Sequence, residues 1–163
     1  MYNRSMGDKE TTVSIIYDLL RDALLEQQKQ RNSLEAKSNM LTAFAGGMFA
    51  LLISARVTLL SLPIIGQLLV GLSIFLFSVS VILALVATWV RKYRIDPNPE
   101  ILANNYLNVR PSKLKLQLVS NMVGAWKENA KIIEQNANKL RFAFLLQTFA
   151  FLSLGIAVFL SIF

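Results

Sequence analysis

Cysteine and histidine are both absent from the 163 residues of the chain, and only 17% of the residues are charged. Without cysteine there is no disulfide and no thiolate nucleophile, and without histidine the commonest metal ligand and the usual base near neutral pH are missing. These absences exclude most of the familiar enzyme chemistries. The sequence therefore predicts a non-enzymatic protein with no catalytic residue, no metal site and no cofactor.

Apolar residues are instead abundant, at 54% of the sequence. They gather into three stretches without a charged side chain: Ser38 to Ala55, Val57 to Val90 and Phe142 to Phe163. A helix needs about 20 apolar residues to cross a bilayer. The first stretch reaches that length if it continues past Arg56, whose long side chain can extend to the headgroups. The second stretch is too long for one span, and Pro63 marks a turn inside it.

An all-α integral membrane protein with three transmembrane helices follows from this pattern. The predicted spans are Asn39 to Leu60, Ile64 to Val90 and Phe142 to Ile162. A tight turn at Ser61 to Pro63 joins the first two spans as a hairpin. Because a long polar and charged segment precedes the first span, no cleaved signal peptide is expected.

Four segments result from this division of the chain. They are an amino-terminal amphipathic helix in residues 1–38, a transmembrane hairpin in 39–90, a helical segment in 91–141 and a third span in 142–163. Six basic residues precede the first span, ten lie between the second and third spans, and only Arg56 lies in the hairpin. Since basic loops stay in the cytoplasm, we expect a multi-pass protein of the inner (plasma) membrane with a cytoplasmic amino terminus. The net charge of +7 then reflects this retention, and no nucleic-acid partner is predicted.

Two long amphipathic helices are predicted outside the spans. The first is capped by Thr11 or Thr12 and runs on into span one. The second begins at Pro111, where proline suits the first turn, and continues to the carboxyl terminus. A further short helix is expected at Glu100 to Leu107.

The apolar stripes of these two helices are expected to pack on each other, antiparallel or in a bundle, with membrane-surface binding as the alternative. The predicted contacts of this cytoplasmic bundle are Ile16, Leu20, Met122, Trp126 and Ile133. Trp126 is expected to be buried near Ile16 or Leu20. The polar residues Asn129 and Asn136 lie seven apart at the edge of the stripe, so they are expected to fix the bundle register, with ligand contact as the alternative.

Small residues within the spans predict close helix packing, because a short side chain lets two backbones approach in lipid. The predicted packing residues are Ala43, Gly46, Gly47, Ala50, Ser73, Ser80 and Ala84. Two interpretations stay open: packing inside the hairpin, or contact with a neighbouring copy in a homo-oligomer. The polar groups of the spans include no acid or base, which argues against a carrier, and they are expected to bond to backbone carbonyls or to each other.

The order of a few polar segments resembles that of small bacterial membrane proteins of the Pycsar-effector and SLATT type, over about Thr11 to Phe163. The segments that carry the resemblance are Leu34 to Ser38, Arg91 to Arg94, Asp96 to Pro99, the pair Asn129 and Asn136, and Lys139 to Arg141. The resemblance implies a membrane-disrupting effector of a nucleotide-signalled antiphage system. Since no separate soluble nucleotide-binding domain is evident, sensing is expected in the cytoplasmic helices or in another polypeptide.

Two functional hypotheses follow. The leading one is an oligomeric membrane protein that perturbs the membrane when it is triggered from the cytoplasm. The alternative is a membrane anchor or scaffold subunit for a soluble cytoplasmic partner. The expected partners are the lipid bilayer, further copies of the chain, and a cytoplasmic protein or nucleotide signal.

Overall fold

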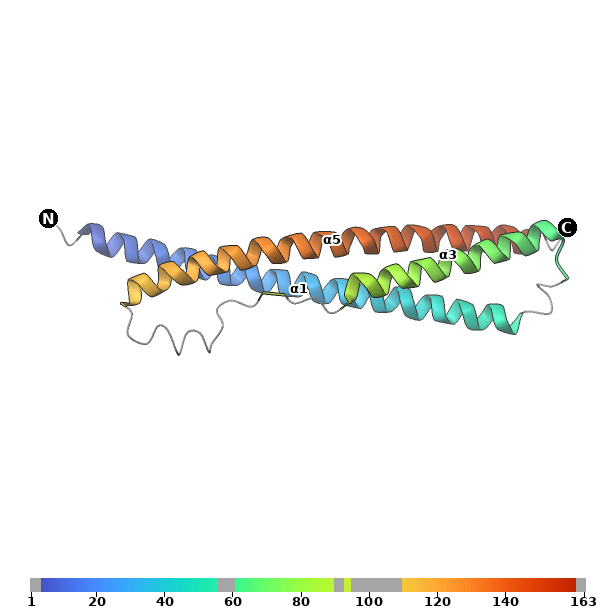
Figure 1. Cartoon of the computed structure of the whole chain (residues 1–163), viewed down its shortest axis with the longest axis horizontal. Coiled ribbons are helices and arrows are strands. Elements are labelled where there is room, and N and C mark those ends of the chain that lie inside the picture. The colour runs from blue at the N-terminus through green and yellow to red at the C-terminus, as the bar shows by residue number, and fades with distance from the viewer. Residues whose placement is uncertain (1–3, 56–60, 90–92, 95–109, 161–163) are drawn as a thin grey trace. The chain divides into compact units, whose positions relative to one another are not determined.

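The computed structural model describes residues 4–55, 61–89, 93–94 and 110–160. All of the regular secondary structure in these residues is helical. Three long helices make up this part of the chain: α1 (Arg4–Ser54), α3 (Ile64–Thr88) and α5 (Pro111–Phe159) (Figure 1). All three are long and apolar enough to cross a membrane. The prediction of an all-α protein with three transmembrane helices is confirmed.

Two helices begin where the prolines of the sequence predict. α5 is one continuous helix of 49 residues from Pro111, and α3 begins directly after Pro63 but ends at Thr88 instead of Val90. The predicted cap at Thr11 or Thr12 is wrong, because α1 begins at Arg4. The residues before the two threonines contain no proline and one glycine, so helix formation costs little there. The predicted helix at 100–107 and the end of span one lie outside the described residues.

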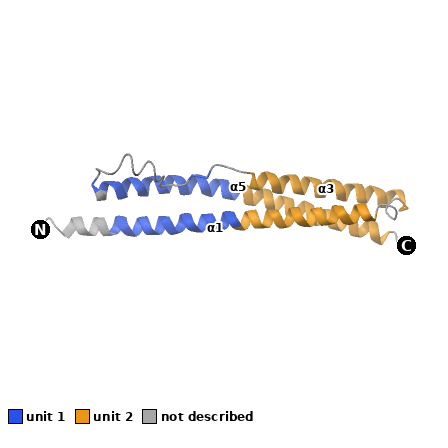
Figure 2. Cartoon of the chain, turned by 90° about the horizontal axis from the view of Figure 1, so that it is seen from below, with its two compact units in different colours: residues 1–32, 91–134 blue, residues 33–90, 135–163 orange. Residues whose placement is uncertain are grey.

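The chain divides into two compact units (Figure 2). Unit 1 comprises residues 1–32 and 91–134, and unit 2 comprises residues 33–90 and 135–163. Since α1 and α5 each extend over both ranges, these two continuous helices contribute to both units. α3 belongs to unit 2 alone.

In unit 2, α3 runs antiparallel to both other helices. The hydroxyl of Ser73 donates to the carbonyl oxygen of Ala150 at 2.9 Å, and that of Ser80 donates to Ala143 at 2.8 Å. The partner's number falls by seven as the serine's number rises by seven, so α3 runs antiparallel to α5. Within the part of α1 that belongs to unit 2, Ser38 bonds to Ala84 at 2.9 Å and the later residue Leu52 packs near Val70, so α1 is also antiparallel to α3. α1 and α5 therefore run in the same direction.

The core of unit 2 is rich in small residues at heptad spacing, with Phe77 as its largest fully buried side chain. In α3 the buried positions recur at alternating intervals of four and three residues: Gly66, Val70, Ser73, Phe77, Ser80, Ala84 and Ala87. Such spacing keeps one seam of the helix against its neighbours. Large apolar side chains face outward instead, and Ile64 and Leu68 are 77% and 68% exposed. A small-residue core inside an apolar exterior suits helices that pack within lipid.

Candidate functional site

The candidate site is not identified by a cluster of catalytic or metal-binding side chains. Among the described residues, no group of three or more His, Cys, Asp or Glu side chains could hold a metal ion. The carboxylates that the structure places in ion pairs include Asp22, Glu26 and Glu128, and all three are exposed and contact an arginine or a lysine. The feature that brings polar side chains together is a pocket in unit 1, between α1, α5 and the short segment at 93–94.

The two helices of unit 1 run parallel. Gln27 Nε2 donates to the carbonyl oxygen of Trp126 at 2.9 Å, and Lys115 Nζ donates to Ser14 Oγ at 3.4 Å. The two pairs are separated by 99 and 101 residues in sequence, so the residue numbers on both helices rise together. The antiparallel option is therefore wrong. The physical reason is that each helix continues into a membrane-spanning part of unit 2, and those two parts run in one direction.

The expected burial of Trp126 is also wrong. Trp126 is 40% exposed and Ile16 is 41% exposed, whereas Met122 is buried at 1%. Trp126 lines a shallow groove with Gln27 and Gln30 of α1, so it does not lie near Ile16 or Leu20.

The reason is the line of contact on α5. The buried residues there are Met122, Ala125 and Asn129, which follow heptad spacing. The predicted stripe instead placed Trp126 four residues after Met122, and that position lies beside the seam. A small alanine suits the seam better, because it lets the two helices approach closely. Leu20 and Ile133 are partly buried.

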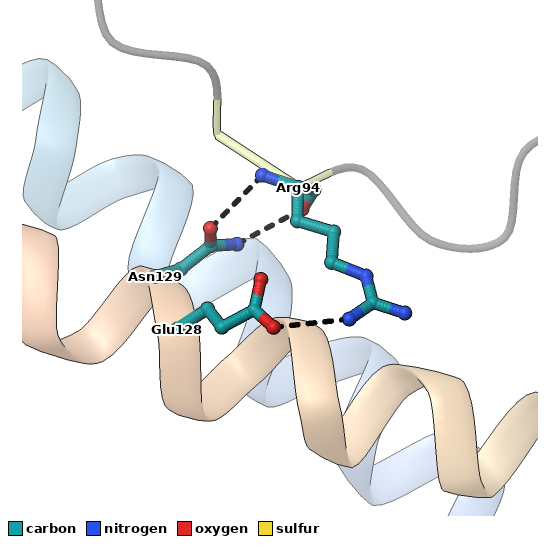
Figure 3. Close-up of polar contacts among 3 residues, drawn as sticks. All are labelled: Arg94, Glu128 and Asn129. Carbon is teal, nitrogen blue, oxygen red and sulfur yellow. Dashed lines mark hydrogen bonds and ion pairs between the residues drawn. The ribbon is translucent and has the colours of Figure 1, made fainter.

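Asn129 binds the backbone of Arg94 through both ends of its side-chain amide (Figure 3). Its Oδ1 accepts from the Arg94 N–H at 3.1 Å, and its Nδ2 donates to the Arg94 carbonyl oxygen at 3.0 Å. The guanidinium of Arg94 also donates to Glu128 Oε1 at 3.1 Å. Asn129 is buried at 7% exposure, and its amide matches the donor and acceptor of a peptide unit. Asn129 therefore anchors the chain at Arg94 onto α5.

This anchored segment closes one side of a pocket of about 400 Å³ in unit 1. Three arginines and two tyrosines line the pocket: Arg21, Arg31, Arg94, Tyr17 and Tyr93. The guanidinium of Arg31 lies 4.3 Å from the centroid of the Tyr93 ring, which is a cation–π contact. Guanidinium groups match phosphate oxygens in shape and charge, and aromatic rings stack on flat bases. The pocket thus has the chemistry to bind a phosphorylated, flat ligand.

The sequence interpretation missed this pocket. Tyr93 and Arg94 enter the sequence analysis only as part of the segment Arg91 to Arg94 that carries the family resemblance. The signal was present on α1, where pocket-lining residues recur at intervals of four and three: Tyr17, Arg21, Leu24, Gln28 and Arg31. These five positions have the spacing of a packed helix seam, but most of their side chains are polar. Such a pattern indicates that this face of α1 does not pack against an apolar helix face.

The predicted small-residue positions of the spans fall into two groups. Ser73, Ser80 and Ala84 are buried in the core of unit 2 at 0%, 1% and 0% exposure. Ala43, Gly46, Gly47 and Ala50 are exposed, and a side chain added at Gly46 or Gly47 would meet nothing within 4 Å. Packing inside the hairpin is therefore wrong for these four residues of α1. The seam of α1 instead follows heptad spacing through Ser38, Ala45 and Leu52.

Most of the described hydroxyl groups of the spans bond to backbone carbonyls, as predicted, but Thr42 Oγ1 is buried without a hydrogen-bond partner. Ser153 donates to Leu69 of the neighbouring helix at 2.9 Å. Ser78 and Thr148 donate to the carbonyl four residues earlier in their own helix, at 2.8 and 3.0 Å. These bonds satisfy their hydroxyls within the protein, which is what an apolar membrane interior requires.

Fold and composition together define a multi-pass helical membrane protein. The Pycsar effector protein domain matches residues 19–163. The chain belongs to this family, and it is a membrane effector of nucleotide-signalled antiphage defence. No curated protein and no solved structure matches the chain.

Proposed function

We propose that the chain is a self-associating effector that permeabilises the inner membrane when a nucleotide signal binds unit 1 in the cytoplasm. The family match over residues 19–163 is the observation that carries this proposal. No catalysis is needed, because the output is a change in the packing of membrane helices.

The arginine and tyrosine pocket of unit 1 supports a nucleotide signal. A phosphate group there would compete with Glu128 for the guanidinium of Arg94, now 3.1 Å away. It would similarly compete with Asp22, which lies 3.7 Å from Arg21. Binding would therefore exchange ion pairs within the chain for contacts to the ligand. α1 and α5 are continuous helices of 51 and 49 residues, so a shift in their pairing would be carried along them into the spans.

The outward small residues of α1 support self-association. Ala43, Gly46, Gly47 and Ala50 leave a strip of helix without large side chains. In lipid, such a strip gains contact area only when another helix packs closely against it. A second copy of the chain is the partner that is always present in the same membrane.

Dye release from vesicles tests the proposal. Purified protein is reconstituted in vesicles with a trapped dye, and cyclic and linear mononucleotides are added one at a time. We expect one nucleotide to release the dye, and the double variant Arg31→Gln/Arg94→Gln to insert normally but respond weakly or not at all. Arg110→Gln/Lys113→Gln is the matched control, because it removes the same charge from two exposed residues that do not line the pocket.

The scaffold alternative gives a different result. It predicts a stoichiometric protein that copurifies with the chain, with no dye release for any nucleotide and no loss of membrane potential in cells that express the chain. That combination would contradict the proposed function.

A further inference from the structure

The side of unit 2 where α1 faces α5 is built differently from the other two sides. Between α3 and its neighbours, buried serine hydroxyls reach backbone carbonyls at 2.8 to 2.9 Å. Between α1 and α5, the amide of Gln147 reaches the carbonyl oxygen of Leu41 only at 3.4 Å. The rings of Phe44 and Phe151 also meet there, with centroids 4.8 Å apart. Long amide and aromatic side chains keep helix backbones farther apart than serine and alanine do.

A groove of about 640 Å³ results on this side, lined by α1 and α5 alone. Its volume lies in the range of small-molecule sites. The walls carry apolar side chains that face outward, including Met40, Phe44 and Phe144 at 75%, 45% and 61% exposure. Two basic residues, Lys37 and Arg141, line the same groove.

Lys37 and Arg141 are placed at the boundary between charged and uncharged sequence. Lys37 directly precedes the charge-free stretch of α1, and Arg141 directly precedes that of α5. Because α1 and α5 run in the same direction within unit 2, both basic groups lie toward the same end of the groove. This end corresponds to the headgroup level of a bilayer, and the apolar remainder corresponds to the level of the acyl chains.

We propose that this groove binds one anionic phospholipid, with its phosphate at Lys37 and Arg141 and an acyl chain along Met40, Phe44 and Phe144. Two positive charges at the headgroup level favour an anionic lipid over a zwitterionic one. The apolar walls explain why the ligand is a lipid and not a free phosphate. The inference does not rest on the proposed function, since it requires only that unit 2 lies in a bilayer.

Electron paramagnetic resonance of spin-labelled lipids tests the site. The full chain is reconstituted in phosphatidylcholine containing a small share of spin-labelled phosphatidylglycerol or phosphatidylcholine, and the immobilised fraction of each label is measured. We expect a preference for phosphatidylglycerol that falls in Lys37→Gln/Arg141→Gln, on the order of fivefold for each lost basic group. The control Lys131→Gln/Lys139→Gln removes the same charge from residues that do not line the groove, and it should keep the preference.

A second variant separates the groove from its charge. Thr148 is an exposed residue of the groove wall, so Thr148→Trp should fill the apolar part without disturbing the core. We expect it to lower the immobilised phosphatidylglycerol while both basic groups remain. The proposal is overturned if Lys37→Gln/Arg141→Gln keeps the full preference. It is equally overturned if the control pair loses as much, because general attraction to the basic segments would then explain the binding.

Discussion

Asn129 uses both ends of its side-chain amide to bind one residue, Arg94, at 3.1 Å from the backbone N–H and 3.0 Å from the carbonyl oxygen. The side chain thus takes the place of a neighbouring peptide unit. This arrangement brings the chain after the second span onto α5 and completes the arginine pocket. Asn129 therefore has a structural role, although it differs from the predicted role in helix register.

Removing this amide should release Arg94. In Asn129→Ala both hydrogen bonds are lost, at a net cost of about 1 to 3 kcal/mol. We expect hydrogen exchange at the Arg94 amide to accelerate roughly tenfold or more, since about 1.4 kcal/mol corresponds to a factor of ten. Asn138→Ala, at an exposed position of the same helix, should leave the rate unchanged. Equal exchange rates in Asn129→Ala and the parent would show that this contact does not hold the segment.

The serine bonds between helices predict a difference between two nearby hydroxyls. Ser80 donates to Ala143 of α5, whereas Ser78 donates to Ile74 of its own helix. Ser80→Ala should lower the free energy of unfolding in bicelles by about 0.6 to 2 kcal/mol, the range for such bonds between membrane helices. Ser78→Ala should change it less, because no contact between helices is lost. A larger effect at Ser78 would contradict the assignment of the α3–α5 seam.

Two large side chains of α5 should differ in their importance to unit 1. Met122 is 1% exposed and Trp126 is 40% exposed. Truncation of a buried methionine to alanine costs about 2 to 5 kcal/mol, and Met122→Ala should reduce the exchange protection of α1 amides around Gln27 accordingly. Trp126→Ala should cost less than the roughly 3 to 5 kcal/mol of a buried tryptophan. The bond from Gln27 should survive it, since the acceptor is the backbone carbonyl of Trp126. A larger effect of Trp126→Ala than of Met122→Ala would instead support the predicted stripe, in which Trp126 is buried against α1.

The spans and their breaks could be predicted from the sequence because they depend on local properties. Long charge-free stretches fix the number of spans, and Pro63 and Pro111 mark where α3 and α5 begin. The sequence also implied that α1 and α5 run in the same direction. One span lies between them, and consecutive spans cross the membrane in opposite directions.

The contact seams and the pocket could not be predicted in the same way. An apolar stripe at a period of 3.6 residues and a seam at 3.5 diverge slowly along a long helix. On α5 this difference decides whether Ala125 or Trp126 lies against α1. The pocket depends further on the contact between Arg94 and Asn129, which are 35 positions apart in sequence. No local pattern specifies such a contact.

The distribution of basic residues makes a prediction about orientation. Sixteen of the 17 basic residues lie before the first span or between the second and third spans, which should keep those segments in the cytoplasm. A phosphatase fused after Phe163 should therefore be active outside the cytoplasm, and a green fluorescent protein fused before Met1 should be fluorescent inside it. A fluorescent fusion after Phe163 together with an inactive phosphatase there would contradict the predicted orientation.

The small outward residues of α1 allow the self-association proposal to be tested without damage to the fold. A side chain added at Gly46 would meet nothing within 4 Å in the chain itself, and the same is true of Gly155 on α5. Leucine at Gly46 should separate two packed copies, because close backbone approach supplies the attraction in lipid. We expect Gly46→Leu to weaken self-association on the order of tenfold, or about 1.4 kcal/mol, in energy transfer between labelled chains in vesicles. Gly155→Leu adds the same volume to another helix and should have little effect. If the parent protein is monomeric, or if both variants weaken self-association equally, the α1 surface is not the site of assembly.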